Sequence, residues 1–119
     1  MRHANFQALS GVDTGSVNGI QIDSNQLVMA SFQAVFGDTS AVGTFKLQAS
    51  NDICNDQYQP NTFIVTNWTD IPNQSASISA GGTALLTIDY CVYRWIRAVY
   101  VSASGGSSTV VVNANVLSQ

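Results

Sequence analysis

Apolar and polar residues alternate along short segments of this chain. In residues 26–36 every even-numbered position from 28 onward is apolar, and residues 42–50 and 109–117 show a similar alternation. Successive side chains of a β-strand point to opposite faces, so a period of two predicts strands with one face in a core. No window of convincing length has the period of a helix. The pattern therefore predicts a domain built from strands.

Turn-forming clusters divide the chain into short segments. Loops are expected at 11–19, 51–61 and 103–108, where Gly, Ser, Asn and Asp gather. Pro72 is expected to end a strand, because proline cannot donate a hydrogen bond within a sheet. We expect about eight strands, drawn from residues 5–9, 20–23, 26–36, 42–50, 62–71, 75–79, 83–89, 93–102 and 109–117.

The length and the strand pattern together predict one all-β domain. A chain of 119 residues has the length of a single domain, and we assign residues 1–119 to it. Antiparallel strands in this number favour a two-sheet sandwich, jelly-roll-like or of a related Greek-key type. Residues 5–9 are expected at a sheet edge, and residues 1–4 are expected to form a flexible arm.

Charged residues are scarce in this sequence. They make up 9% of the chain, which contains no glutamate and has Lys46 as its only lysine. Helical surfaces ordinarily use Glu, Lys and Arg, so this composition also favours strands. A net charge of −3 with four cations argues against nucleic-acid binding through phosphate contacts. A weakly charged surface rich in amides and hydroxyls suits packing against other proteins, where charges would be costly to desolvate.

The sequence shows no segment for membrane insertion or targeting. No apolar run approaches the roughly 18–20 residues of a membrane span. Residues 1–10 lack the apolar stretch of a signal peptide. We therefore expect the protein to be made in the cytoplasm, or to leave the cell by another route or within an assembly.

Catalytic equipment is not recognisable in the sequence. His3 is the only histidine and lies near the N-terminus, which argues against Ser-His-Asp and Cys-His arrangements. No Cys/His spacing suits zinc. Asn51, Asp52, Asn55 and Asp56 crowd one loop with oxygen atoms, but they lack the spacing of an EF-hand calcium site. We therefore predict no enzyme activity, no cofactor and no metal site.

The strand at residues 93–102 is predicted to be apolar on both faces. If Ile96, Ala98 and Tyr100 face the core, the opposite face is too apolar for open water and suggests a protein contact. Its aromatic residues either fill a core or a subunit interface, or form a stacking platform for sugars. The candidate interface residues are Trp95, Arg97, Val99, Val101 and Trp68.

The two cysteines, Cys54 and Cys91, leave the redox state open. Two separate thiols are the default for a protein that stays in the cytosol. A disulfide between Cys54 and Cys91 is the alternative, provided that the fold brings them together.

Two stretches of the sequence carry a family resemblance. The first is Gly43–Asp52 (GTFKLQASND), followed by Asn67–Ile71 (NWTDI); the second is Tyr93–Tyr100 (YRWIRAVY), followed by Gly105 and a valine-rich last strand. In this order, and with Asn5–Leu9 at the start, they resemble small virion structural proteins of tailed and marine bacteriophages. The match spans most of the chain, and its motifs are structural rather than chemical. A longer loop and both cysteines depart from the family pattern.

The resemblance implies a non-catalytic β-sandwich that decorates or cements a capsid, or that forms part of a spike or tail. Its partners would be the major capsid protein or other virion proteins and further copies of the chain. A trimer is preferred, because hexagonal lattices offer three-fold sites. The protein would lie on the capsid exterior and contact neither nucleic acid nor membrane. The alternative is a receptor- or carbohydrate-binding module of a spike or tail fibre, which a further resemblance, to discoidin-like carbohydrate-binding sandwiches, favours.

Overall fold

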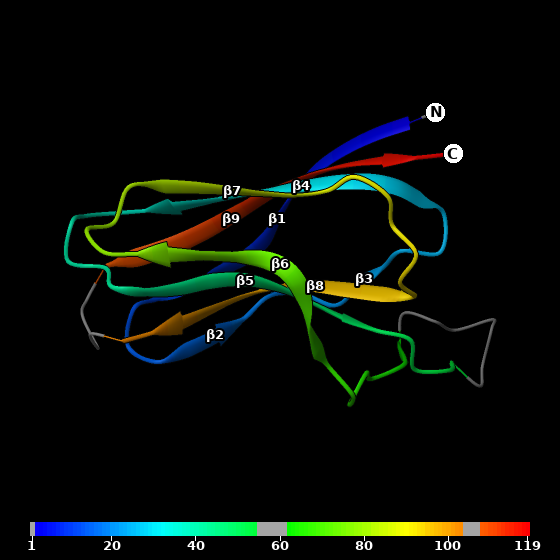
Figure 1. The fold of residues 1–119 in the computed structure, drawn as a ribbon, viewed down its shortest axis with the longest axis horizontal. Helices are drawn as coiled ribbons and strands as arrows, with labels where there is room; N and C mark the ends of the chain where they lie inside the picture. The colour runs from blue at the N-terminus through cyan, green and yellow to red at the C-terminus, as the bar shows by residue number, and fades with distance from the viewer. Residues whose placement is uncertain (1, 55–61, 104–107) are drawn as a thin grey trace.

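The computed structural model describes residues 2–54, 62–103 and 108–119. Nine strands form two antiparallel sheets that face each other, which confirms the predicted all-β sandwich (Figure 1). No helix in those three ranges is long and apolar enough to cross a membrane. The strands are β1 (Arg2–Val12), β2 (Ser16–Asn18), β3 (Ile22–Asp23), β4 (Leu27–Phe36), β5 (Gly43–Ser50), β6 (Thr69–Ile78), β7 (Thr83–Ile88), β8 (Trp95–Ser102) and β9 (Thr109–Ser118).

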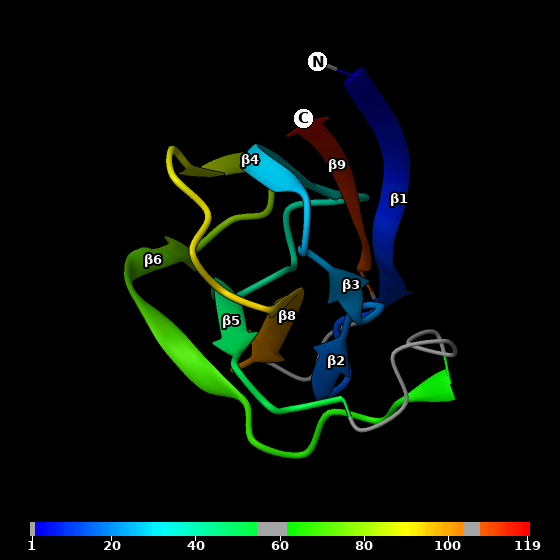
Figure 2. The same ribbon diagram turned by 90° about the vertical axis from the view of Figure 1, so that its right-hand side faces the viewer.

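The order of the strands is that of a jelly roll. One sheet has the order β1-β9-β4-β7, and the other has the order β2-β8-β5-β6, with the short β3 also paired to β8. The antiparallel pairs are therefore nested: β1 pairs with β9, β2 and β3 pair with β8, β4 pairs with β7, and β5 pairs with β6. This nesting brings the first and last strands side by side, and Figure 2 shows them running together to the two chain ends.

The core lies between the two sheets and follows the predicted alternation. The even-numbered residues from 30 to 36 of β4 and from 110 to 116 of β9 are buried. Phe32 of one sheet and Phe45 and Leu47 of the other are among the largest fully buried side chains. Complete burial of such a side chain contributes about 1.5–3 kcal/mol.

The chain begins in a strand rather than in an arm. β1 starts at Arg2, and residues 2–4 pair with the end of β9; Met1 lies outside the described residues. This corrects the predicted arm over residues 1–4, because the long β9 offers backbone groups to pair with along its whole length. β1 lies at the edge of its sheet, as expected for residues 5–9. The short β2 is an additional strand inside the predicted loop at 11–19.

Pro72 does not end a strand, contrary to the prediction. β6 continues through Pro72 and takes in most of the segment predicted at 75–79, whereas residues 62–68 form no strand. β6 lies at the edge of its sheet, where a missing N–H costs little. Its pairing with β5 skips residues 71–74, where Asn73 has a φ of 63°. Pro72 therefore sits in a bulge that interrupts the pairing without ending the strand.

Candidate functional site

The predicted interface residues surround the outward face of β8. Trp95 is 1% exposed and Val99 is 3% exposed, so both are buried although neither belongs to the main core between the sheets. Trp95 is covered by residues 62–68, here called the covering segment, which pass over this face before β6 begins (Figure 2). Four of the predicted residues, Trp95, Arg97, Val99 and Val101, follow one another along the outward side of β8, and Trp68 of the covering segment contacts Arg97.

Aromatic contacts join the covering segment to β8. The ring of Phe63 stacks on Trp95 with centroids 5.6 Å apart and planes inclined by 25°. The guanidinium of Arg97 lies 4.4 Å from the centre of the Trp68 ring, within cation–π distance. Val65, which lies between Phe63 and Trp68 in the sequence, is also buried. These contacts make a second, smaller core on the outside of the five-stranded sheet.

The side chain of Gln21 holds the backbone of the covering segment. Its Nε2 donates to the carbonyl of Phe63 at 2.6 Å, and its Oε1 accepts from the N–H of Val65 at 2.9 Å. One planar amide thus supplies a donor and an acceptor, as the backbone of a neighbouring strand would. Gln21 precedes β3, so the clamp connects the covering segment to the strand that borders β8.

Replacing Gln21 with alanine is expected to lower the free energy of unfolding by about 1–2 kcal/mol, because two partly buried hydrogen bonds are lost. The amide of Val65 should also exchange its hydrogen faster. Urea unfolding and hydrogen exchange followed by NMR measure the two effects. Gln26→Ala, at an exposed position, is the matched control and should change neither quantity. Equal behaviour of the two variants would contradict the clamp.

Asp52 ties down the far end of the covering segment. Its Oδ2 accepts from the N–H groups of Thr66 and Asn67 at 3.0 and 3.1 Å, and its Oδ1 accepts from the side-chain amide of Asn67 at 2.9 Å. These bonds, with that from the Asn67 side chain foremost, lower the pKa of Asp52. Its carbonyl also accepts from Nε1 of Trp95 at 3.1 Å. One residue therefore bonds both the covering segment and the tryptophan beneath it.

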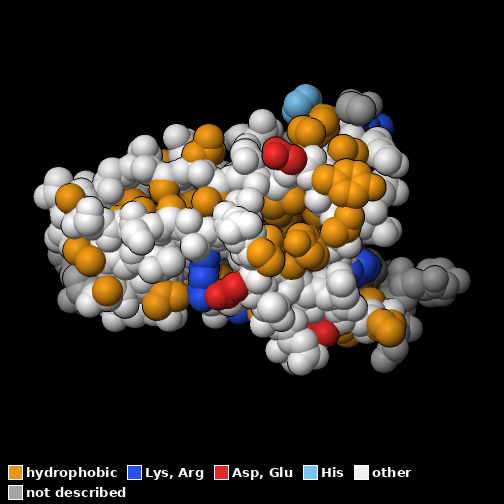
Figure 3. Space-filling view, viewed as in Figure 1, with side chains coloured by type: hydrophobic (Ala, Val, Ile, Leu, Met, Phe, Trp, Pro, Cys, Tyr) orange, Lys and Arg blue, Asp and Glu red, His pale blue; other side chains and the backbone are white. Residues whose placement is uncertain are grey.

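Polar side chains continue from Arg97 across the five-stranded sheet. The Arg97 guanidinium donates twice to Oε1 of Gln48, at 2.9 and 2.7 Å. Gln48 in turn donates to Asp70 at 2.9 Å, and Lys46 forms an ion pair with Asp70 at 3.1 Å. These donors, Gln48 first, lower the pKa of Asp70, and burial lowers the pKa of Arg97. Figure 3 shows such oppositely charged side chains adjoining one another over this layer.

The enclosed position of Trp95 bears on the predicted sugar platform. A ring that stacks on ligand needs an open face, whereas Trp95 lies between Phe63 and the guanidinium of Arg94, which is 4.1 Å from its centre. Trp95 therefore has no open face to offer. The half-buried residues Arg97, Val101 and Trp68 are the accessible part of the predicted interface, and their contact with another protein stays a prediction.

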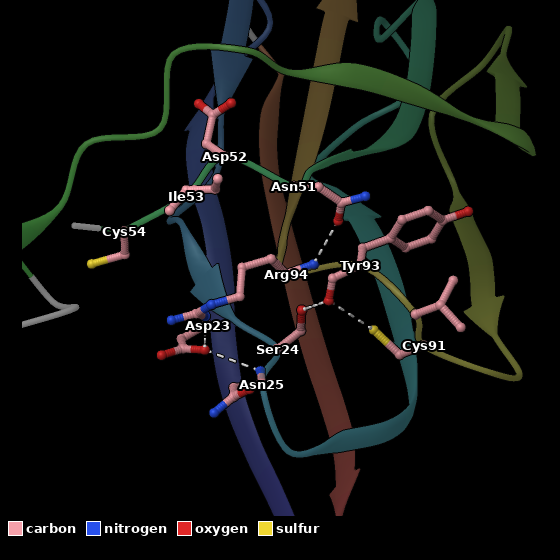
Figure 4. A pocket seen from close by; sticks show the side chains of 11 residues that line it. Asp23, Ser24, Asn25, Asn51, Asp52, Ile53, Cys54, Cys91, Tyr93 and Arg94 are labelled. Carbon is pink, nitrogen blue, oxygen red and sulfur yellow. Dashed lines mark hydrogen bonds and ion pairs between the residues drawn. The ribbon is translucent and has the colours of Figure 1, made fainter. Parts of the chain in front are cut away.

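A cavity of about 800 Å³ opens at the end of the sandwich beside this covered face. Arg94 and Asp23 form an ion pair in it, and Oδ1 of Asn51 accepts from the N–H of Arg94 at 3.0 Å (Figure 4). The hydroxyl of Ser24 donates to the carbonyl of Tyr93. These bonds connect the loops before β4, after β5 and before β8 into one rim.

A second cavity of about 490 Å³ adjoins the first. Both are lined by Asn51, Asp52 and Tyr93, so these three residues form a shared wall. Ile71 and Pro72 of the β6 bulge add an apolar side to the second cavity. We call the two cavities together the loop-end groove. The oxygen-rich loop at Asn51 and Asp52 is evident in the sequence, but no sequence pattern predicted a groove there.

The two cysteines face the first cavity from opposite sides in Figure 4. They are separate thiols in the structure. Asn55 and Asp56 of the oxygen-rich loop lie outside the described residues. Within the described ranges, no group of three or more His, Cys, Asp or Glu side chains is placed to hold a metal ion.

The four-stranded sheet differs from its partner in charge. Arg2 is the only Asp, Glu, Lys or Arg residue in β1, β4, β7 and β9. On the outward side, Asn113 of β9 lies opposite Gln7 of β1 and Gln33 of β4, so amide side chains cross the sheet in a row. Aliphatic side chains flank this row. We call this surface the uncharged face, which includes Gln7, Met29, Gln33, Val35, Leu85 and Asn113.

Comparison with known proteins places the fold among phage-derived and other bacterial structures. No known family model and no curated protein matches the sequence. The PBSX exported protein XepA superposes with a TM-score of 0.63 at 17% identity over 98% of this chain; the chain spans only 37% of XepA. The SPBc2 prophage-derived protein YomS superposes with a TM-score of 0.56 at 13% identity, and the match covers 98% of this chain and 94% of YomS. The Yersinia pseudotuberculosis-derived mitogen superposes with a TM-score of 0.50 at 17% identity, and the match covers 99% of this chain and 88% of the mitogen. At these identities the likeness is one of fold, and proteins of phage origin share it.

Proposed function

We propose that this chain is a structural protein of a bacteriophage virion, of the capsid decoration or cement type. In this proposal it binds the major capsid protein and further copies of itself on the capsid exterior and stabilises the shell by these contacts, without catalysis. The uncharged face is the observation that carries the proposal. The phage origin of XepA and YomS, which share the fold, and the resemblance of the strand motifs to virion proteins support it.

The uncharged face suits a contact that excludes water. Burying a charged group costs several kcal/mol unless it is paired, whereas an amide needs only a hydrogen-bonding partner. The amide row of Gln7, Asn113 and Gln33 supplies both donors and acceptors, so it can match another amide-rich surface, including its own. Leu85, 63% exposed, adds apolar area beside this row. Such a surface combines the apolar core and the polar hydrogen bonds of a protein interface.

Symmetry favours a closed assembly of identical chains. Closed oligomers are the rule among homo-oligomeric proteins, and a shell with hexagonal lattices offers three-fold positions. We therefore propose a trimer, held by many small contacts rather than by one ion-pair network. Size-exclusion chromatography with light scattering measures the state directly. A strict monomer that also fails to bind virus particles would contradict the proposal.

Placing a charge on the uncharged face is expected to weaken binding to the particle at least about tenfold, which corresponds to about 1.4 kcal/mol. Leu85→Asp is the test variant, because the carboxylate must lose water when the face is covered. Ser77→Asp, an exposed position on β6 of the other sheet, is the matched control and should bind like the unmodified chain. Co-sedimentation with particles that lack the protein gives the affinities. Equal binding by both variants would argue against this face as the contact.

A further inference from the structure

The loop-end groove combines an aromatic ring with an oriented amide. Tyr93 is half-buried and lines both cavities, and Figure 4 shows its ring pointing away from the Arg94–Asp23 pair. In the same view Asn51 lies between the Tyr93 ring and the Arg94–Asp23 pair. Because its Oδ1 accepts from the N–H of Arg94 at 3.0 Å, its amide nitrogen points away from Arg94, as Figure 4 also shows. A donor is thus held in place near the Tyr93 ring, which packs partly against the main core and partly lines the two cavities.

The charges of the groove are compensated within the chain. Asp23 is paired with Arg94, and Asp70 is paired with Lys46. Asp52 accepts three hydrogen bonds from the covering segment, which stabilise its carboxylate. No lining carboxylate therefore needs an ion from outside, and an anionic ligand would still meet the negative charge of Asp52, which no cation pairs. The groove fits a neutral ligand that offers hydroxyl groups.

We infer that the loop-end groove binds a neutral oligosaccharide. The face of a sugar ring carries C–H groups that pack on an aromatic ring, while its hydroxyls bond to amides and carboxylates on either side. Tyr93 and Pro72 supply the apolar surface, and Asn51 and Asn67 supply amide groups. Each of the two cavities has a volume in or near the usual range of about 300–1,000 Å³ for small-molecule sites. Because the cavities adjoin at their shared wall, an oligosaccharide lying across Asn51, Asp52 and Tyr93 would reach both.

This site is separate from the uncharged face and goes beyond the virion role proposed above. The groove belongs to the five-stranded sheet and to the loops at its end, whereas the uncharged face belongs to the other sheet. A structural protein with both surfaces would hold a particle by one and a glycan by the other. Of the aromatic residues expected from the sequence to form a sugar platform, the site uses Tyr93 and not the enclosed Trp95.

The test titrates the full chain with cellohexaose, mannohexaose and xylohexaose, and with the anionic hexagalacturonate, by isothermal calorimetry. At least one neutral oligosaccharide should bind with a dissociation constant of about 1 mM or tighter, and the anion should bind more weakly than that sugar. Tyr93→Ala should weaken binding about tenfold or more. Tyr90→Ala, at a residue 77% exposed outside both cavities, is the control and should bind normally.

Two further variants separate binding from folding. Tyr93→Phe keeps the ring and should bind within about threefold of the unmodified chain. Asn51→Asp keeps an acceptor for the N–H of Arg94 but removes the donor, so it should weaken binding while the fold persists. Failure of all three neutral sugars to bind, or normal binding by Asn51→Asp or by folded Tyr93→Ala, would overturn the inference. Particle binding by Tyr93→Ala and sugar binding by Leu85→Asp test the two surfaces independently.

Discussion

Replacing Trp95 with alanine is expected to lower the free energy of unfolding by about 3–5 kcal/mol, the range for truncating a buried aromatic side chain. The variant loses the stack on Phe63, the cation–π contact with Arg94 and the hydrogen bond to the carbonyl of Asp52. It also leaves a space under the covering segment, which should detach more readily. Urea unfolding measures the loss, and hydrogen exchange of the Val65 amide reports the detachment.

Trp68→Ala is the informative comparison for Trp95→Ala. Trp68 is half-buried, and the guanidinium of Arg97 lies 4.4 Å from the centre of its ring. A cation–π contact at such a position contributes about 0.5–1 kcal/mol, so the loss should be several-fold smaller than at Trp95. Similar losses in the two variants would contradict the enclosed position of Trp95. The difference also matters for binding assays, because reduced binding by Trp95→Ala would reflect a damaged fold.

Sequence periodicity predicted the sheets well and the covering segment poorly, for a physical reason. Alternation appears where one face of a strand meets the core and the other meets water, as in β4 and β9. β8 is buried on both faces, so its apolar outward residues Trp95 and Val99 were interpreted as a contact with another protein. The cover comes from the same chain. Its positioning depends on the side chains of Gln21 and Asp52, and polar residues in loops carry no periodic signal.

The error at Pro72 has a related cause. A proline ends a strand only where its missing N–H would have been used, and this depends on which strands lie at the edge. The order of strands in a sheet is set by contacts distant in sequence, so residues 62–71 were assigned to a strand that in fact begins later. The loop-end groove could not be predicted from the sequence for the same reason. Asn51 and Tyr93 belong to separate loops, and only the pairing of β5 with β8 brings their loops together.

A buried pair at the opposite end of the sandwich should make the stability depend on alkaline pH. The hydroxyl of Tyr100 donates to Oδ1 of Asp13 at 3.0 Å, and both residues are fully buried. A side chain on the adjacent Gly43 would place its Cβ 2.7 Å from this hydroxyl, so the surroundings are closely packed. Burial above all, with the hydrogen bond and the charge of Asp13 adding to it, raises the pKa of Tyr100 to about 12.

Tyr100→Phe is therefore expected to lower the free energy of unfolding by about 1.5–3 kcal/mol at neutral pH, because the buried carboxylate loses a donor. The pH dependence should change as well. The unfolded tyrosine ionises near pH 10 and the folded one near 12, so the stabilisation is complete below pH 10 and is lost as the pH rises to 12. The slope in this window is at most about 1.4 kcal/mol per pH unit. Tyr100→Phe should remove this slope, and the exposed Tyr90→Phe should preserve it. Urea unfolding at pH 7 to 12 gives both quantities, and an unchanged alkaline slope in Tyr100→Phe would show that another group is responsible.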